Sequence, residues 1–127
     1  MRVFICAHVL EGILQAARRT YPNEFFCLLG GGKTKDAYFV REIVYIPFRS
    51  GPTFALYHVT DIPFDSSIIG SAHTHPGPAL PSSADLHSFP YAGWVHMIVS
   101  YPYTAENVRV YDARGKELHW SVTECGQ

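Results

Sequence analysis

Two histidines, His73 and His75, stand two positions apart where an apolar run of the sequence ends. Alternate residues of a β-strand point to the same face, so a strand here would place both imidazole rings side by side, close enough to bind one ion. Asp85 follows ten residues after His75, and the proline-rich stretch between them can fold it back over the end of the strand. Two histidines and one carboxylate leave a fourth tetrahedral position open, which is the arrangement of a catalytic zinc site.

A purely structural role for the same residues is also consistent with the sequence. A His-x-His pair on a strand is more often hydrogen-bonded than metal-bound, and Ser82-x-x-Asp85 is by itself a helix-capping signature. The combination of His-Thr-His-Pro, a proline-rich loop and Ser-x-x-Asp-Leu favours the metal site. His73, His75 and Asp85 are therefore the predicted metal ligands.

Hydrophobic periodicity predicts the elements that position these residues. Residues 9–20 follow a helical pattern that Pro22 terminates, and Ser82 begins a short helix that Pro90 stops. Strand patterns cover residues 25–30, 38–47, 54–59, 67–75, 94–101, 108–112 and 117–123, with a hairpin turn at 113–116 between the last two. These elements predict an α/β fold in which a mixed β-sheet is flanked by helices.

Length and composition restrict the class of protein. The 127 residues fit one domain spanning 1–127, and 47% apolar against 17% charged side chains exclude a disordered chain. Ten basic and eleven acidic side chains give a net charge of −1, without the basic excess of a nucleic-acid-binding protein. No apolar stretch approaches the roughly 20 residues of a membrane span or the pattern of a signal peptide. We therefore expect a soluble cytoplasmic protein that binds neither nucleic acid nor membrane.

The three cysteines, Cys6, Cys27 and Cys125, match neither a disulfide framework nor a cysteine-rich zinc site. Cys6 and Cys27 lie in apolar runs, and we expect them to behave as small core residues. One disulfide is compatible with this number of cysteines, but nothing in their spacing favours it.

The segment with His-Thr-His-Pro and Ser-x-x-Asp resembles the metal motif of the JAMM (MPN+) family of zinc peptidases, whose pattern is Glu … His-Ser/Thr-His-Pro … Ser-x-x-Asp. Residues 22–30 resemble the family's glutamate segment, and the elements follow the family order over nearly the whole chain. The compact length is similar to that of the archaeal and bacterial single-domain members. The resemblance implies the JAMM/MPN fold, a cytidine-deaminase-like architecture, and one Zn²⁺ per chain held by His73, His75 and Asp85.

The resemblance also implies the catalytic residues. Glu24 would take a proton from the attacking water and pass it to the leaving amine, and Ser82 would help to stabilise the tetrahedral oxyanion. Taken by itself, Glu24 has the pattern of a surface carboxylate after a turn, and only the family pattern gives it this role. The loop between His75 and Ser82 holds six residues where the family usually has seven. Ser83 would restore the spacing but has Leu86, not an acid, three positions later, so Ser82 remains the expected residue.

The implied activity is zinc-dependent cleavage, as an isopeptidase or peptidase, after the C-terminal glycine of a ubiquitin-like modifier. A related alternative keeps the chemistry and releases an amino acid from a ubiquitin-like sulfur-carrier protein. An alternative of another class is a non-catalytic MPN scaffold, which the presence of all five motif residues disfavours. The expected partner is a ubiquitin-like modifier or its conjugates, with residues 49–65 as the candidate wall for its tail, and the oligomeric state stays open.

Overall fold

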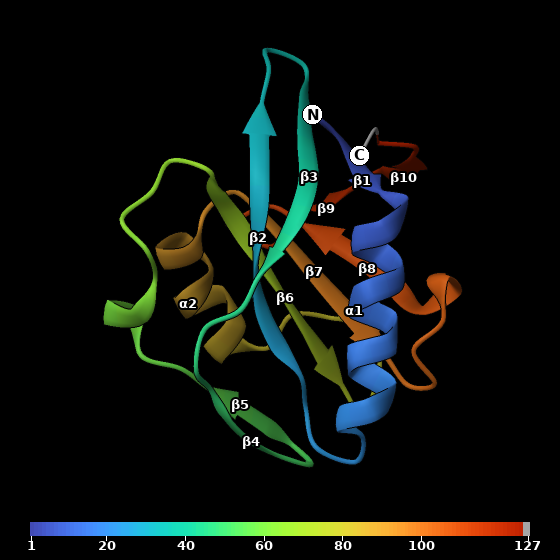
Figure 1. Cartoon of the computed structure of the whole chain (residues 1–127). Coiled ribbons are helices and arrows are strands. Elements are labelled where there is room, and N and C mark those ends of the chain that lie inside the picture. The colour runs from blue at the N-terminus through green and yellow to red at the C-terminus, as the bar shows by residue number, and fades with distance from the viewer. Residues whose placement is uncertain (126–127) are drawn as a thin grey trace.

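The computed structural model describes residues 1–125. Its elements follow the chain as β1 (Arg2–Cys6), α1 (Ala7–Thr20), β2 (Phe26–Lys33), β3 (Ala37–Val44), β4 (Arg49–Gly51), β5 (Phe54–Leu56), η1 (Val59–Asp61), β6 (Ile68–His75), α2 (Ser83–Ala92), β7 (Val95–Ser100), η2 (Ala105–Asn107), β8 (Val108–Tyr111), β9 (Glu117–Leu118) and β10 (Trp120–Thr123). One mixed sheet contains eight strands, and β4 and β5 form a separate two-stranded sheet (Figure 1). The predicted α/β fold, a mixed sheet flanked by helices, is confirmed.

The large sheet has the strand order β10-β1-β3-β2-β6-β7-β8-β9. β1 is parallel to both β3 and β10, β6 is parallel to β7, and the other neighbours are antiparallel. Only His119 separates β9 from β10, although these strands lie at opposite edges of the sheet. The sheet therefore curls until its edges approach, and the Trp120 indole N–H of β10 donates to the Val108 carbonyl of β8 at 3.3 Å.

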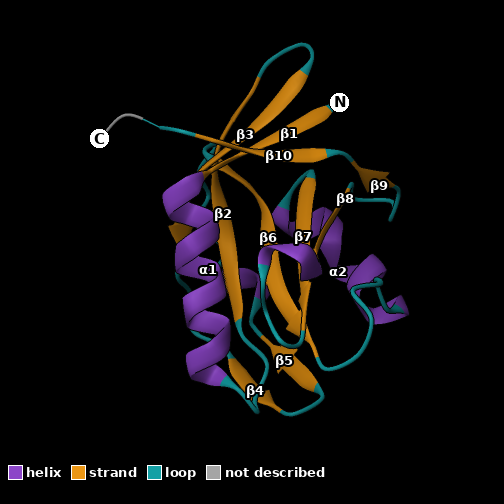
Figure 2. Cartoon of the chain, turned by 90° about the vertical axis from the view of Figure 1, so that its right-hand side faces the viewer, coloured by secondary structure: helices purple, strands orange, loops and turns teal. Residues whose placement is uncertain are grey.

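The two helices lie on opposite sides of the sheet (Figure 2). α1 is amphipathic, and it packs into the largest core cluster through Val9, Leu10, Ile13, Leu14 and Ala17. α2 connects β6 to the parallel strand β7, so the three form a βαβ unit whose helix begins beside the carboxyl end of β6. Within residues 1–125, no helix has the length and hydrophobicity needed to span a membrane.

Pro90 does not stop the second helix, contrary to the prediction, because α2 continues to Ala92. The proline removes the N–H that would bond to the Leu86 carbonyl, and Leu86 is exposed, so water can satisfy this carbonyl. The helix ends instead at Gly93, whose N–H donates to the Phe89 carbonyl at 3.2 Å. The φ of 134° at this position favours glycine.

The strand predictions fail at β1, at the division between β9 and β10, and at the β4–β5 hairpin. β1 was not predicted. It lies between β3 and β10 and is parallel to both strands. The predicted strand 117–123 is divided at His119, because β9 pairs with β8 and β10 pairs with β1. The predicted strand 54–59 stops at Leu56, and its partner β4 was not predicted. The hairpin turn at 113–116 is confirmed, with Gly115 at a φ of 88°.

A disulfide bond joins Cys6 to Cys125 over a sequence separation of 119 residues. Cys6 is buried, as expected, but the prediction that it is only a small core residue was wrong. The bond ties the end of β1 to the residues that follow β10, next to the place where these two strands pair. Cys27 is a free and buried cysteine, as predicted.

Candidate metal centre

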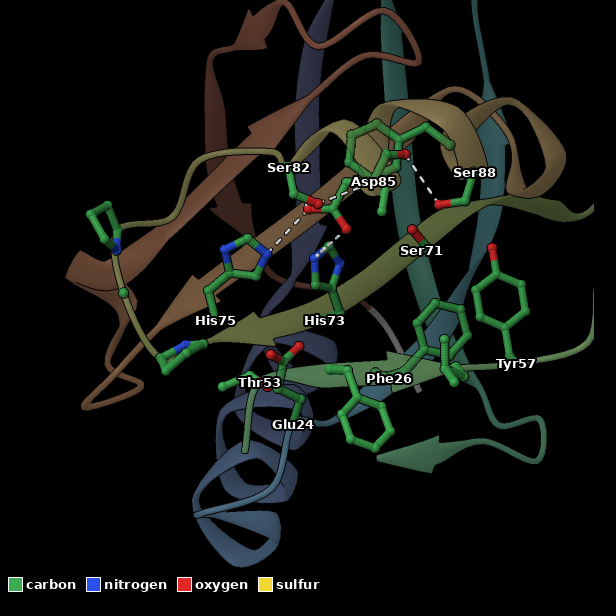
Figure 3. Close-up of a pocket in the computed structure, with 18 residues that line it drawn as sticks. Glu24, Phe26, Thr53, Tyr57, Ser71, His73, His75, Ser82, Asp85 and Ser88 are labelled. Atoms are coloured by element: carbon green, nitrogen blue, oxygen red, sulfur yellow. Dashed lines mark hydrogen bonds and ion pairs between the residues drawn. The ribbon is translucent and has the colours of Figure 1, made fainter. Parts of the chain in front are cut away.

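His73 and His75 lie at the carboxyl end of β6, with their rings turned toward the first turn of α2 (Figure 3). β6 is held in register on both sides, because His73 is paired with Phe26 of β2 and with Ile98 of β7. The two imidazole centroids are 4.9 Å apart. The strand therefore presents the two rings on one face, as the i, i+2 spacing predicted.

Asp85 faces both histidines from the third residue of α2. Its Oδ1 lies 3.2 Å from Nε2 of His73, and its Oδ2 lies 3.1 Å from Nε2 of His75. The same carboxylate completes a capping box, in which its Oδ2 accepts from the Ser82 N–H at 2.9 Å and the Ser82 Oγ accepts from the Asp85 N–H at 3.1 Å. The capping and metal interpretations of the sequence are therefore compatible, because the cap orients the carboxylate toward the rings.

The three side chains fit a metal ion. Their ligand atoms all lie within 4.8 Å of one another, and tetrahedral zinc with bonds of about 2.0–2.1 Å needs ligand atoms roughly 3.3 Å apart. Nε2 of His73 is buried and has no hydrogen-bond partner, although it lies at ion-pair distance from Asp85. A buried nitrogen without a partner costs about 1–3 kcal/mol, and coordination to a cation would satisfy it.

Electrostatics favour the ionised form of the carboxylate at this site. Burial would raise the pKa of Asp85, but its interactions with the two histidines and the Ser82 N–H hold that pKa well below its usual range. The hydrogen bond to Asp85 raises the pKa of His75 in turn. A metal ion needs a carboxylate without its proton, and this environment supplies one.

Glu24 enters the same site from the segment between α1 and β2. Its N–H donates to the Gly51 carbonyl at 2.9 Å, and the next residue, Phe25, exchanges two hydrogen bonds with Thr74 of β6. Only 6% of Glu24 is exposed, and its carboxyl group points toward the histidines (Figure 3). Burial raises its pKa, and the neighbouring rings of His73 and His75 partly counteract this. The structure therefore excludes the alternative that Glu24 is a surface carboxylate.

All five residues expected from the sequence line one cavity of about 360 Å³. β6 forms its floor, α2 forms one wall, and residues 53–57 of the β4–β5 hairpin form the wall opposite. Residues 59–65, which belong to the predicted wall for a substrate tail, do not line this cavity. Ser82 is exposed at the rim, where its backbone begins the helix cap.

Among the other residues that line the cavity, the sequence analysis did not single out Phe26, Ser71, Ser88 and Phe89. Two of them carry a local signal that would have found them. Ser71 lies two residues before His73 on β6, and Ser88 lies three residues after Asp85 on α2, so each shares a face with a predicted ligand. Tyr57 belongs to the predicted wall 49–65. It lines the cavity, and its ring stacks on Phe26 at 4.2 Å.

Comparisons with known proteins agree with this geometry. Residues 7–113 match the family model of Prok-JAB, the prokaryotic homologs of the JAB domain. A protein of Haloferax volcanii named "Probable metalloprotease" is 36% identical over 131 residues, which cover 97% of this chain and 81% of the relative.

Two solved structures share the fold over almost the whole chain. A JAB1/MPN domain protein of Archaeoglobus fulgidus is 34% identical with a TM-score of 0.71, and the match covers 98% of this chain and 100% of that one. A structure presented as "JAMM: A Metalloprotease-like Zinc Site in the Proteasome and Signalosome" is 29% identical with a TM-score of 0.68, again over 98% and 100% of the two chains. Together with the family match and the arrangement of Glu24, His73, His75, Ser82 and Asp85, these likenesses show that the chain belongs to the Prok-JAB family of JAMM/MPN+ metallopeptidases.

Proposed function

We propose that the chain is a zinc-dependent peptidase or isopeptidase that cleaves after the C-terminal glycine of a ubiquitin-like protein or its conjugates, with one Zn²⁺ per chain. The observation that carries the proposal is the convergence of the three ligand atoms within 4.8 Å of one another, beside a buried glutamate in the same cavity. The names of two relatives, "Probable metalloprotease" and "Metalloprotease-like Zinc Site", support the class of reaction.

The residues of the cavity have different roles in the proposed amide hydrolysis. His73 and His75 would hold the ion through Nε2, and Asp85 would hold it through a carboxylate oxygen. When bound, zinc supplies a Lewis acid that polarises the scissile carbonyl and lowers the pKa of water to about 7. Glu24 would take a proton from the attacking water and then give it to the departing amine. Its burial beside the two histidines places the carboxyl group where it can carry out both proton transfers (Figure 3).

The walls of the cavity suit an extended tail without bulky side chains. Phe26 and Tyr57 stack beside it with an interplanar angle of 13°, and Phe89 lines it from α2. In the described chain β5 pairs only with β4, so its other edge has main-chain groups that can pair with a peptide strand. A tail ending in Gly-Gly would lie along this edge, with its last carbonyl beside the histidines.

The proposal is tested with a panel of ubiquitin-like proteins from the same organism, each fused through its C-terminal glycine to a short peptide. We expect the zinc-loaded protein to cleave at least one fusion after that glycine, and replacement of the penultimate glycine by leucine to abolish the cleavage. Mass spectrometry of the products identifies the bond that is cut. Efficient cleavage of the leucine variant would contradict the extended-tail model. Failure to hydrolyse any fusion, including a ubiquitin-like sulfur carrier bearing one amino acid, would contradict the proposed activity.

Ser82 should matter for the rate as well as for the helix cap. Its Oγ already accepts a hydrogen bond from the Asp85 N–H, and its hydroxyl proton stays available to an oxyanion. In Ser82→Asp the cap is kept, because aspartate is as good an N-cap as serine. An ionised aspartate cannot donate to the oxyanion and repels it, so turnover should fall by about 10²–10³. Urea unfolding, zinc content and hydrolysis are measured together, and normal turnover would show that Ser82 only caps the helix.

A further inference from the structure

One buried histidine outside the metal centre is held in a single orientation beside the cavity. His96 of β7 is 0% exposed, and its Nδ1 lies 2.8 Å from the Ser71 Oγ, whereas its Nε2 lies 2.9 Å from the Gly93 carbonyl oxygen. The ring of Phe89 stacks on it at 4.0 Å with an interplanar angle of 4°. Contacts at both nitrogens and on the ring face therefore fix the position of this imidazole.

These contacts also determine which atom carries the proton. A carbonyl oxygen can only accept a hydrogen bond, so Nε2 of His96 must be the N–H that donates to Gly93. Burial lowers the pKa of His96 to about 4, so the ring is neutral at pH 7 and Nδ1 has only a lone pair. The Ser71 hydroxyl must then donate its proton to Nδ1. The Ser71 oxygen keeps only lone pairs for any further contact, so it can accept a hydrogen bond and cannot donate one.

Ser71 presents this acceptor to the cavity. It lies on the same face of β6 as His73, two residues farther from His75, and it lines the cavity together with Phe26 of β2, which pairs with His73 (Figure 3). Only 3% of Ser71 is exposed, so its oxygen is shielded from bulk water. The proton transfers described above do not use it, and its orientation depends on a histidine that does not reach the metal centre.

An extended peptide beside β6 would bring a donor to this oxygen. Two residues of strand span about 6.5–7 Å, so the tail residues next to Ser71 precede the scissile bond by one or two positions. A tail that pairs with β5 bonds through every second residue, and the residues between them turn their N–H groups to the other side. Such an N–H faces the interior of the cavity, where Ser71 on the floor offers an acceptor.

We infer that Ser71 is a substrate-positioning residue whose hydroxyl oxygen, oriented by His96, accepts a hydrogen bond from a main-chain N–H of the tail on the acyl side of the scissile bond. The inference rests on the proposed function, since it concerns the tail of that substrate. It differs from a purely structural role, in which the Ser71–His96 contact would only join β6 to β7. A structural role affects stability alone, whereas the positioning role affects the affinity for one particular amide of the tail.

The test measures how tightly fluorescent peptides bind to the zinc-loaded protein. Each peptide contains the Gly-Gly end of the tail, followed by further residues beyond the scissile bond. The protein carries Glu24→Gln so that the peptide is not consumed. In three analogues, each of the last three amide N–H groups before the scissile bond is replaced in turn by an ester oxygen. Esters at N–H groups that pair with β5 should weaken binding in every variant. One further ester should weaken binding by about 5–10-fold, the equivalent of one hydrogen bond, only in protein that retains Ser71. Adding Ser71→Ala should weaken binding of the all-amide peptide by a similar factor, and the sensitive ester should then cause no further loss.

Two further variants separate positioning from structure. Ser71→Thr keeps the hydroxyl and should keep the ester penalty. Ser88→Ala, in the same cavity, removes a hydroxyl that already donates to the Asp85 carbonyl at 3.1 Å, and should also leave the penalty unchanged. Zinc content and thermal unfolding are recorded for every variant.

The inference is overturned if no ester weakens binding to the protein that retains Ser71, or if every ester penalty persists in Ser71→Ala. The first of these outcomes does not depend on whether any Ser71 variant folds. If the all-amide peptide does not bind to the zinc-loaded protein at all, the proposed function itself fails, and the inference falls with it.

Discussion

Replacing His73 by alanine should release the metal ion and abolish peptide hydrolysis in the same variant, and His75→Ala should do the same. Loss of a group that merely orients a metal ligand already lowers affinity by 10–100-fold, so loss of a ligand itself should lower it by more than about 10²-fold. Elemental analysis of the purified protein and hydrolysis of a tail fusion give the two readouts. Activity should return to the wild-type protein, but not to either variant, when zinc is added after chelation.

His87→Ala is the matched control, because His87 is an exposed histidine on α2 that does not line the metal cavity. It should keep both zinc and activity. Circular dichroism would show whether the His73 and His75 variants keep their fold. Full turnover by a folded variant shown to be free of metal would remove the metal centre from the mechanism.

Glu24→Gln should keep the zinc and lose most of the activity. The amide has nearly the shape of the carboxyl group, so the backbone contacts of residues 24 and 25 with Gly51 and Thr74 should persist. An amide cannot accept the proton of the attacking water, and the loss of a general base typically costs about 10²–10⁴ in rate. Single-turnover hydrolysis on zinc-loaded protein measures this loss directly.

Glu11→Gln serves as the control for the glutamate substitution, because Glu11 is exposed on α1 and bonds only to Gln15 on the same helix among the described hydrogen bonds. Its turnover should equal that of the wild type. Near-normal turnover by a zinc-loaded Glu24→Gln protein would show that another group accepts the proton.

The two largest predictions differ in how far the sequence alone supports them. His73, His75 and Asp85 lie within one βαβ unit, and their meeting depends on strand alternation, one loop and one helix cap. Each of these features depends on residues that are close together in the sequence, so it can be predicted from the sequence. Glu24 belongs to a different part of the chain, and only a resemblance to a family suggested its role. Its burial beside the rings follows from hydrogen bonds between Phe25 and Thr74, which are 49 residues apart.

The same division explains the errors in the fold. α1 and the central strands have periodicities that are visible in the sequence, and the structure confirms them. β1 and the break at His119 depend on which strands become neighbours, and in this sheet β1 lies between β3 and β10. The bond between Cys6 and Cys125 likewise joins residues that are 119 positions apart. No window of sequence contains both partners of such a contact.

The sequence by itself therefore determined the ligands of the candidate metal centre, the order of the main helices and strands, and the class of fold. Short-range geometry controls these features, because side-chain alternation and helix capping act within a few residues. Only the tertiary structure decided that Glu24 is buried beside the histidines, that Phe26 and Ser71 line the cavity, and that His96 orients the Ser71 hydroxyl. These features depend on the curl of the sheet and on the order in which its strands pair. The strand order depends on packing across the whole chain rather than on the residues adjacent in sequence.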